Sequence, residues 1–327
     1  MKSPLLSLPG AVPAEGVDEQ VAAHYGDLFR EQRALADGNG FVDLSHRGVV
    51  AVTGEDRLSW LHLLLTQHVT DLPAGRATEA LILSAHGHIE HALYLVDDGT
   101  TTWAHVEPGT QEALIAYLES MKFFYRVDVT DRTAEFALVH LPAGSIAEVP
   151  EGVVVRETAY GRDLFLPRAD LESYAENPAS VAKHGPPVGL LAYEALRVEH
   201  HQPRLGFETD HRTIPHELGW IDSAVHLQKG CYRGQETVAR VENLGKPPRR
   251  LVFLHLDGSE VHLPGHGTEL RLAEEGEEGR KIGFITTSVR HHELGPIALA
   301  LVKRNVPLDA PLLADTTAAA QEVVVEP

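Results

Sequence analysis

The octapeptide Lys229-Gly230-Cys231-Tyr232-Arg233-Gly234-Gln235-Glu236 contains the single cysteine of this 327-residue chain. One cysteine cannot build a disulfide framework or a cysteine-cluster metal site. The two glycines indicate a turn with positive φ or a close approach of the backbone to a ligand. Residues 236–241 can begin a helix, so the pattern predicts Cys231 just before a helix N-terminus. Backbone N–H groups, Lys229 and Arg233 would stabilise a thiolate there.

The alternative for Cys231 is a small buried hydrophobe, which free cysteine usually is. Composition alone favours that alternative, whereas the flanking glycines and cations favour a functional thiol.

Composition and charge exclude several classes of protein. The chain has 43% hydrophobic residues, enough for two or three packed domains. Its net charge of -19 repels polyanions, so we expect no direct nucleic-acid binding. No run of eighteen apolar residues is present, so we expect no membrane span. The single cysteine and the weak apolar character of residues 1–10 predict a cytoplasmic protein.

The first half of the chain shows mixed α and β patterns. Apolar spacing predicts an amphipathic helix over residues 15–36, and Thr53-Gly54-Glu55-Asp56 resembles a capping box that opens the next helix. Asp97-Asp98-Gly99 is a strong hairpin signal. Together, residues 48–130 alternate strands and helices as in a ferredoxin-like α+β unit. The further elements that we expect are strands at 41–44, 49–52, 80–83, 89–96, 101–106 and 126–129, strands within 134–166, and helices at 111–121 and 189–199.

The C-terminal part of the chain has the pattern of a small β-barrel or sandwich. Pro247-Pro248 breaks the chain, and short apolar segments separated by glycine and proline follow it. We expect the tail after Asp315 to be loosely ordered. The predicted strands are 251–256, 268–272, 281–286 and 297–302.

The octapeptide resembles the signature of the YgfZ family, folate-binding relatives of the glycine-cleavage T-protein, which is an aminomethyltransferase. The runs that precede it are also similar to T-protein-like sequences. They are Val52 to Asp56 with Leu61-His62, Gly87-His88-Ile89, Arg197-Val198-Glu199, Pro203 to Gly206, and Ile214 to Glu217.

This resemblance implies an α+β fold in three parts around a central folate cavity. The expected divisions are a discontinuous folate-binding domain (1–47 and 131–246), a ferredoxin-like domain (48–130) and a C-terminal β-barrel domain (247–327). The implied cofactor is tetrahydrofolate or a derivative.

Four residues outside the octapeptide match positions that the family uses near folate. Glu199 would accept the pterin 2-amino and N3–H hydrogens in a bidentate contact. Tyr193 would flank the folate, Arg47 would line the cavity, and Arg240 would pair with a folate carboxylate. The alternatives are a surface glutamate at a helix end, ordinary helix packing, an exposed strand residue and a surface cation.

One departure from the T-protein concerns its proton-handling aspartate. The T-protein has an Asp-Asp pair after the Gly-Gly-aliphatic turn, whereas this chain has His91-Ala92. Glu90 is the nearby carboxylate, and strand alternation directs it away from position 91. Without a placed acid, protonation of the folate nitrogen lacks its general acid. The substitution therefore argues against conventional aminomethyl transfer.

His86, His88 and His91 are close enough in sequence to suggest a metal site. On a strand, however, His86 and His88 share one face and His91 lies on the other. We therefore expect no dedicated metal site.

The resemblance implies a folate-dependent accessory factor more than an enzyme. It would support iron–sulfur cluster assembly or repair, and thereby cluster-dependent enzymes such as tRNA-modifying enzymes, with Cys231 as its functional thiol. A nucleophile, a cluster ligand and a sulfur carrier all need the same thiolate. The alternatives are a folate-dependent aminomethyl- or methyltransferase using Glu90 or His91 as acid, and a protein-binding module that has lost its ligand.

Overall fold

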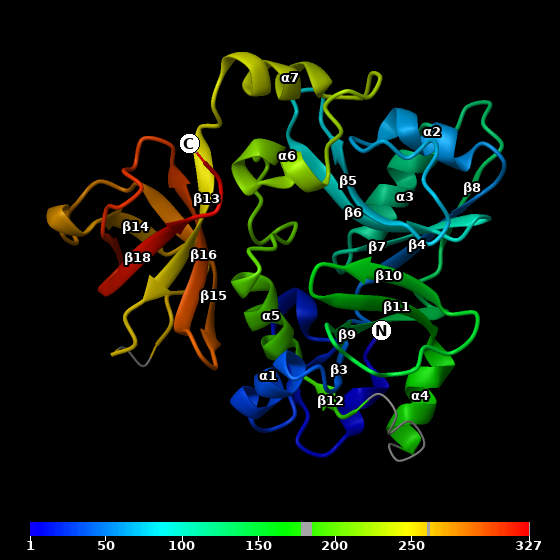
Figure 1. The fold of residues 1–327 in the computed structure, drawn as a ribbon, viewed down its shortest axis with the longest axis horizontal. Coiled ribbons are helices and arrows are strands. Elements are labelled where there is room, and N and C mark those ends of the chain that lie inside the picture. Colours follow the sequence, from blue (N-terminus) through cyan, green and yellow to red (C-terminus); the bar gives the residue numbers. More distant parts are fainter. Residues whose placement is uncertain (178–184, 260–261, 327) are drawn as a thin grey trace. The chain divides into compact units, whose positions relative to one another are not determined.

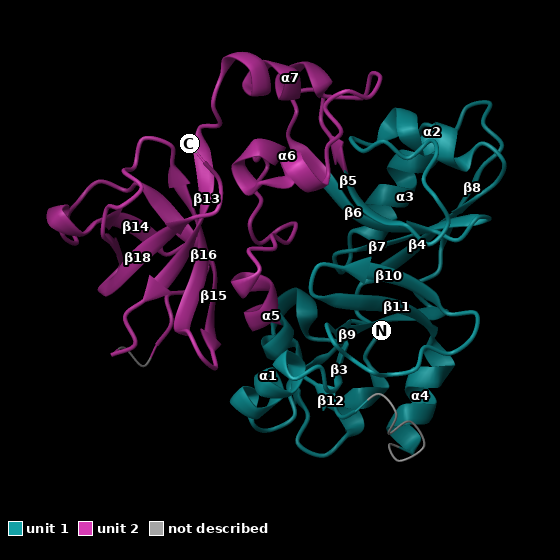
Figure 2. Ribbon diagram, viewed as in Figure 1, with its two compact units in different colours: residues 1–80, 91–193 teal, residues 81–90, 194–327 magenta. Residues whose placement is uncertain are grey.

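A computed structural model describes residues 1–177, 185–259 and 262–326. The chain forms two compact units, which are coloured separately in Figure 2. Unit 1 comprises Met1–Ala80 and His91–Tyr193, and unit 2 comprises Leu81–Glu90 and Glu194–Pro327. The expected α+β class is confirmed by the order of helices and strands in Figure 1. The three-domain division of the sequence remains a prediction.

The N-terminal segment differs from the predicted helix over residues 15–36. Only its second half is helical, as α1 (Leu28–Ala36), whose N-cap Asp27 accepts from Arg30 N. The first half contains a 3-10 turn that begins at Gly16 with φ +63°, and then strand β2 (Ala22–His24). Strand β2 pairs with β1 (Val12–Pro13). The prediction was wrong because the turn at Gly16 and the pairing of β1 with β2 outweigh the helical spacing of a few apolar residues.

The first sheet of unit 1 has the strand order β10-β11-β9-β3-β12. Strands β9, β10 and β11 confirm the strands expected within residues 134–166. Helix α4 follows β11 directly. The bounds are β3 (Phe41–Asp43), β9 (Phe136–Pro142), β10 (Val154–Thr158), β11 (Gly161–Pro167), α4 (Arg168–Glu176) and β12 (Pro187–Val188).

The second sheet has the order β5-β6-β7-β4-β8. Its elements confirm the strands and helices expected between residues 48 and 131, with one strand more than the four of the simplest ferredoxin-like unit. The hairpin at Asp97-Asp98-Gly99 joins β6 and β7 as predicted. The bounds are β4 (Gly48–Thr53), α2 (Arg57–Leu64), β5 (Ala77–Leu83), β6 (Ile89–Asp97), β7 (Thr101–Val106), α3 (Gln111–Ser120) and β8 (Asp128–Asp131).

Helix α2 begins later than the capping-box pattern at residues 53–56 predicts. Its N-cap is Asp56, whose side chain makes no cap hydrogen bond. The Asp56 carboxylate instead accepts from Arg126 N at 2.9 Å and from Arg126 Nε at 3.2 Å. Gly54 has φ +108°, and a Cβ there would lie 2.1 Å from Arg126 O. The 53–56 segment is thus shaped by the approach of the chain at Arg126 rather than by a local cap.

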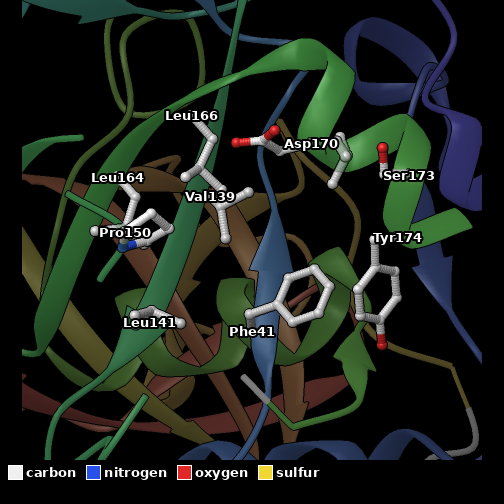
Figure 3. Close-up of a pocket in the computed structure, with 10 residues that line it drawn as sticks. Phe41, Val139, Leu141, Pro150, Leu164, Leu166, Asp170, Ser173 and Tyr174 are labelled. Atoms are coloured by element: carbon white, nitrogen blue, oxygen red, sulfur yellow. The ribbon is translucent and has the colours of Figure 1, made fainter. Parts of the chain in front are cut away.

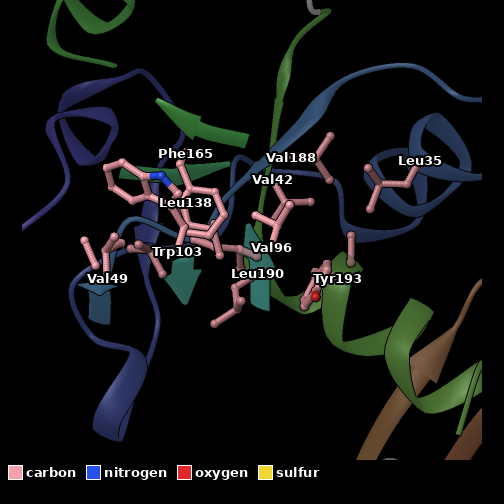
Figure 4. Close-up of a cluster of buried hydrophobic side chains, with 14 residues drawn as sticks. Leu35, Val42, Val49, Val96, Trp103, Leu138, Phe165, Val188, Leu190 and Tyr193 are labelled. Carbon is pink, nitrogen blue, oxygen red and sulfur yellow. The ribbon is translucent and has the colours of Figure 1, made fainter. Parts of the chain in front are cut away.

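The core of unit 1 is a cluster of buried side chains from β3, β4, β6, β7, β9 and β11 together with the start of α5 (Leu190–Glu199) (Figure 4). Trp103 packs edge-on against Phe136, with ring centroids 4.9 Å apart. Burial of each large apolar side chain contributes about 1.5–3 kcal/mol. Tyr193 belongs to this cluster, so one predicted site residue also contributes to the core.

Unit 2 contains a closed barrel with the strand order β13-β16-β15-β14-β17-β18 (Figure 1). The C-terminal barrel that the sequence predicts is therefore confirmed. Its core consists of aliphatic side chains from all six strands. The bounds are β13 (Arg249–Leu256), β14 (Glu269–Leu272), β15 (Gly283–His291), β16 (Gly295–Lys303), β17 (Leu312–Ala314) and β18 (Thr317–Val323).

The expectation of a loosely ordered tail after Asp315 was wrong. Residues Thr317–Val323 form β18, which pairs with β17 on one side and β13 on the other. The segment is rich in alanine and has a weak strand pattern of its own. Its conformation follows from the backbone hydrogen bonds offered by the two neighbouring strands.

Candidate functional site

Cys231 lies on an exposed loop of unit 2, just before a helix. The loop follows α6 (Trp220–Ser223) and leads into α7 (Gln235–Leu244), which confirms the predicted position of Cys231 before a helix N-terminus. Gly234 is the N-cap of α7 and has φ +83°. The alternative of a buried, purely structural cysteine is wrong because the residue is exposed.

The cysteine loop packs against the turn between β5 and β6. A Cβ at Gly234 would lie 2.5 Å from Ser84 O and 3.0 Å from Gly87 Cα. A Cβ at Gly87, whose φ is +80°, would lie 2.7 Å from Thr237 Cβ. Two segments that the sequence separates by more than a hundred residues therefore touch through glycines that leave no room for a side chain.

An ion pair joins the same two segments. Arg233 Nη1 lies 2.8 Å from Glu90 Oε2, and both side chains are partly exposed. Glu90, the carboxylate nearest to the position of the missing Asp-Asp pair, is thus engaged with the cysteine loop. His91 lies near Tyr117, with ring centroids 6.3 Å apart.

Lys229 and Tyr232 are the buried members of the octapeptide. Lys229 Nζ lies 5.1 Å from the centroid of the Tyr232 ring. Burial lowers the pKa of Lys229 to about 8 and raises the pKa of Tyr232 to about 12. Gln235 Nε2 donates to Lys229 O at 3.3 Å, which links the start of α7 to the start of the loop. The buried side chains of Lys229 and Tyr232 thus anchor the loop, while the thiol of Cys231 stays exposed. Gly230 and Glu236 are also exposed.

Arg47 and Tyr193, both buried in unit 1, are brought together by the fold. The Arg47 guanidinium carbon lies 5.9 Å from the centroid of the Tyr193 ring. Arg47 also forms an ion pair with Glu107 at 3.3 Å. Burial raises the pKa of Tyr193. Arg47 is therefore a buried cation beside an aromatic ring, not the exposed strand residue of the alternative interpretation.

Asp163 is the centre of a buried polar network in unit 1 that was not among the predicted site residues. Its carboxylate lies 2.8 Å from His140 Nδ1, 3.3 Å from His105 Nε2 and 2.8 Å from Arg156 Nη1. Burial by itself would raise the pKa of Asp163, but hydrogen bonds from His105 and His140 hold it well below 3.8. Burial lowers the pKa of His105 to about 4. The ionised Asp163 carboxylate is thus buried, and its two histidine donors and the Arg156 cation compensate for its lost hydration.

The Asp163 network reaches Tyr193 through His140. The His140 and Tyr193 rings meet edge to face with centroids 5.0 Å apart. The Tyr193 hydroxyl lies 3.4 Å from the Tyr160 hydroxyl. A usable signal was present in the sequence, because His140 is the single polar residue of the apolar run 136–142 and Asp163 directly precedes the apolar run 164–167.

Glu199 and Arg240 belong to unit 2, whereas Arg47 and Tyr193 belong to unit 1. Glu199 is the last residue of α5, and its Oε2 lies 3.4 Å from His291 Nε2. The Glu199 side chain is 41% exposed. Glu199 follows Tyr193 by six positions, so their side chains leave α5 in different directions. Arg240 is exposed on α7.

The residues that the structure describes contain no group of three or more His, Cys, Asp or Glu side chains that could hold a metal ion. His86 and His88 lie near one another, with ring centroids 6.1 Å apart.

A separate cavity of about 190 Å³ lies in unit 1 between β9, β11 and α4 (Figure 3). Its wall is mostly aliphatic and aromatic, and Phe41 and Tyr174 meet edge to face within it at a centroid distance of 5.0 Å. The predicted site residues are not among those that line this cavity.

Comparison with known proteins finds similarity to aminomethyltransferases. Residues 11–148 match the family described as GCVT N-terminal domain. The chain resembles the glycine cleavage system aminomethyltransferase T of Bartonella henselae, with a TM-score of 0.81 and 20% sequence identity. The match to that crystal structure covers 99% of this chain and 96% of the other chain. The chain has the T-protein fold.

Curated relatives match over nearly the same length. The aminomethyltransferase of Herpetosiphon aurantiacus is 27% identical over 310 residues, which is 85% of this chain and 82% of the relative. The aminomethyltransferase of Geobacillus kaustophilus is 28% identical over 341 residues, covering 93% and 91%. The chain is thus T-protein-like along most of its length, as the resemblance of its motifs indicated.

In the parts of this T-protein-like chain that the structure describes, no helix is both long enough and apolar enough to cross a bilayer.

Proposed function

We propose that this protein binds tetrahydrofolate and supports iron–sulfur cluster assembly or repair in the cytoplasm, as a YgfZ-type member of the T-protein-like proteins. Its clients would be cluster-dependent enzymes such as tRNA-modifying enzymes. The observation that carries the proposal is the exposure of Cys231 on a loop held by close glycine contacts and an ion pair. An accessible thiol on a fixed loop suits a nucleophile, a cluster ligand or a sulfur carrier.

The folate part of the proposal rests on the T-protein fold and on the chemistry of the matched residues. A carboxylate with lone pairs left over can accept the two adjacent pterin N–H groups, and the partly exposed Glu199 meets that requirement. Tyr193 and Arg47 offer an aromatic face and a cation in unit 1. Arg240, exposed on α7, would serve a folate carboxylate.

The same region leads us to expect no conventional aminomethyl transfer. The general acid of that reaction must be free to reach the folate nitrogen. Glu90 is held by Arg233 at 2.8 Å, and His91-Ala92 replaces the acidic pair. We therefore expect no turnover with tetrahydrofolate and a methylamine-type donor. Measurable turnover would instead favour the transferase.

A thermal-shift titration with reduced folates under anaerobic conditions tests folate binding. Tetrahydrofolate at a hundred times its Kd should stabilise the native state by about 2.7 kcal/mol. Wild type and Cys231→Ser should respond equally, because the thiol serves chemistry rather than binding. No rise in Tm with either protein would refute folate binding and favour the ligand-free binding module.

Complementation of a strain that lacks the protein tests the thiol. Cys231→Ser should fail to restore the activity of cluster-dependent enzymes although it is folded and binds folate. Gly230→Ala is the matched control, because no heavy atom lies within 4 Å of its added Cβ. Full restoration by Cys231→Ser would refute the role of the thiol.

A further inference from the structure

Glu199 carries a negative charge at the C-terminus of α5, and the imidazole of His291 lies beside its carboxylate. The residue ends α5, where the exposed carbonyl groups carry partial negative charge. A carboxylate there is disfavoured unless a donor satisfies it. His291, near the end of β15, supplies that donor, with its Nε2 3.4 Å from Glu199 Oε2.

The backbone determines which nitrogen of His291 carries the proton. Glu293 N and Leu294 N both donate to His291 Nδ1, at 3.2 and 3.1 Å. A ring nitrogen that accepts hydrogen bonds carries no proton, so the neutral ring must be protonated at Nε2. Burial lowers the pKa of His291, which favours the neutral ring. The Nε2–H group is therefore the ring donor that faces Glu199.

The difference in exposure between the two side chains gives them different roles. The His291 side chain is 4% exposed, whereas that of Glu199 is 41% exposed. His292 packs on His291, with ring centroids 4.6 Å apart. A ligand can thus reach the carboxylate while the imidazole stays fixed behind it.

We propose that His291 is a positioning residue that orients the Glu199 carboxylate for the two adjacent N–H groups of the pterin. The inference rests on the proposed folate function. An ionised carboxylate has about four acceptor positions, so one bond from His291 leaves enough for a bidentate contact. Rotation of Glu199 is restricted before the ligand arrives, which reduces the entropy lost on binding.

Binding of tetrahydrofolate to three variants tests this positioning. His291→Phe removes the donor and should weaken binding about tenfold or more. His291→Gln keeps an N–H group that can reach Glu199 and should restore most of the affinity. His211→Phe changes an exposed histidine of the same unit and should bind like wild type. The Tm of each variant is measured without ligand to separate folding from binding.

A double mutant distinguishes positioning from general packing. If His291 acts through Glu199, then His291→Phe should cause no further loss of affinity in a Glu199→Gln background. If the fold-loss of affinity in the double mutant equals the product of the losses in the two single mutants, the proposal is overturned. Normal tetrahydrofolate binding by His291→Phe would also overturn it. Failure of wild type to bind tetrahydrofolate would overturn the folate function itself, and is seen before any variant is compared.

The tautomer is tested without ligand. The ¹⁵N chemical shifts of His291 in the free protein should show a proton on Nε2 and none on Nδ1. A proton on Nδ1 would contradict the assigned hydrogen bonds and with them the positioning role.

Discussion

Arg233 and Glu90 join the cysteine loop to the β5–β6 turn through a contact of 2.8 Å. Glu90, which directly precedes His91-Ala92 in the sequence, thereby helps to hold the loop of Cys231. A partly exposed ion pair contributes at most about 1 kcal/mol to stability. The glycine contacts between the same segments must therefore supply much of the specificity of this packing.

Gly234→Ala should destabilise the protein, because the added Cβ would meet Ser84 O at 2.5 Å on a backbone with φ +83°. We expect the free energy of unfolding to fall by about 2 kcal/mol. Gly230→Ala, in the same loop, should change it by less than about 0.5 kcal/mol. Denaturant unfolding of both variants measures the two values. Equal effects would show that the close packing of Gly234 is unimportant.

Asp163→Asn should be strongly destabilising because it removes the buried carboxylate that pairs with Arg156 at 2.8 Å and leaves this buried cation only the longer contact with Glu79 at 3.3 Å. Breaking a buried ion pair by removing one partner costs about 3–5 kcal/mol. Asp170→Asn replaces an exposed aspartate of the same unit and serves as the control. Urea unfolding compares the two. A loss for Asp163→Asn no larger than for the control would contradict the central role of this carboxylate.

Stability should depend on the ionisation of His105 between pH 6.5 and about 4. Burial lowers the pKa of His105 from 6.5 to about 4, so on acidification the unfolded chain takes up this proton first. The stabilisation is fully present above pH 6.5 and is lost as the pH falls towards 4.

Unfolding measured at several pH values checks this dependence. Wild type should lose about 3 kcal/mol more than His105→Gln over that range. Parallel curves for the two proteins would show that His105 titrates normally in the folded state.

Removal of residues 316–327 should open the barrel, because β18 connects β17 to β13. The two strands would then present unpaired edges, and we expect aggregation and faster amide exchange along β13. Deletion of Glu326 and Pro327 leaves β18 intact and should have little effect. Unchanged exchange in β13 after the longer deletion would show that the barrel closes without β18.

Local sequence patterns predicted those helices, strands and turns whose periodicity and turn residues lie within the element itself. The hairpin at Asp97-Asp98-Gly99, helices α3 and α5, and the barrel strands β13 to β16 all form where periodicity and turn residues indicated. The position of Cys231 before a helix was also predictable, because glycine and helix-forming residues act over a few positions.

Tertiary structure decided what depends on distant partners. Residues 15–36 were divided by the pairing of β1 with β2, and β18 forms because two strands flank it. Asp163 meets His140 and His105 from 23 and 58 positions away. Glu199 meets His291 only because β15 lies beside the end of α5. Such contacts join residues that no local pattern relates. The sequence therefore determined which chemical groups are present, and the tertiary structure decided which of them are in contact.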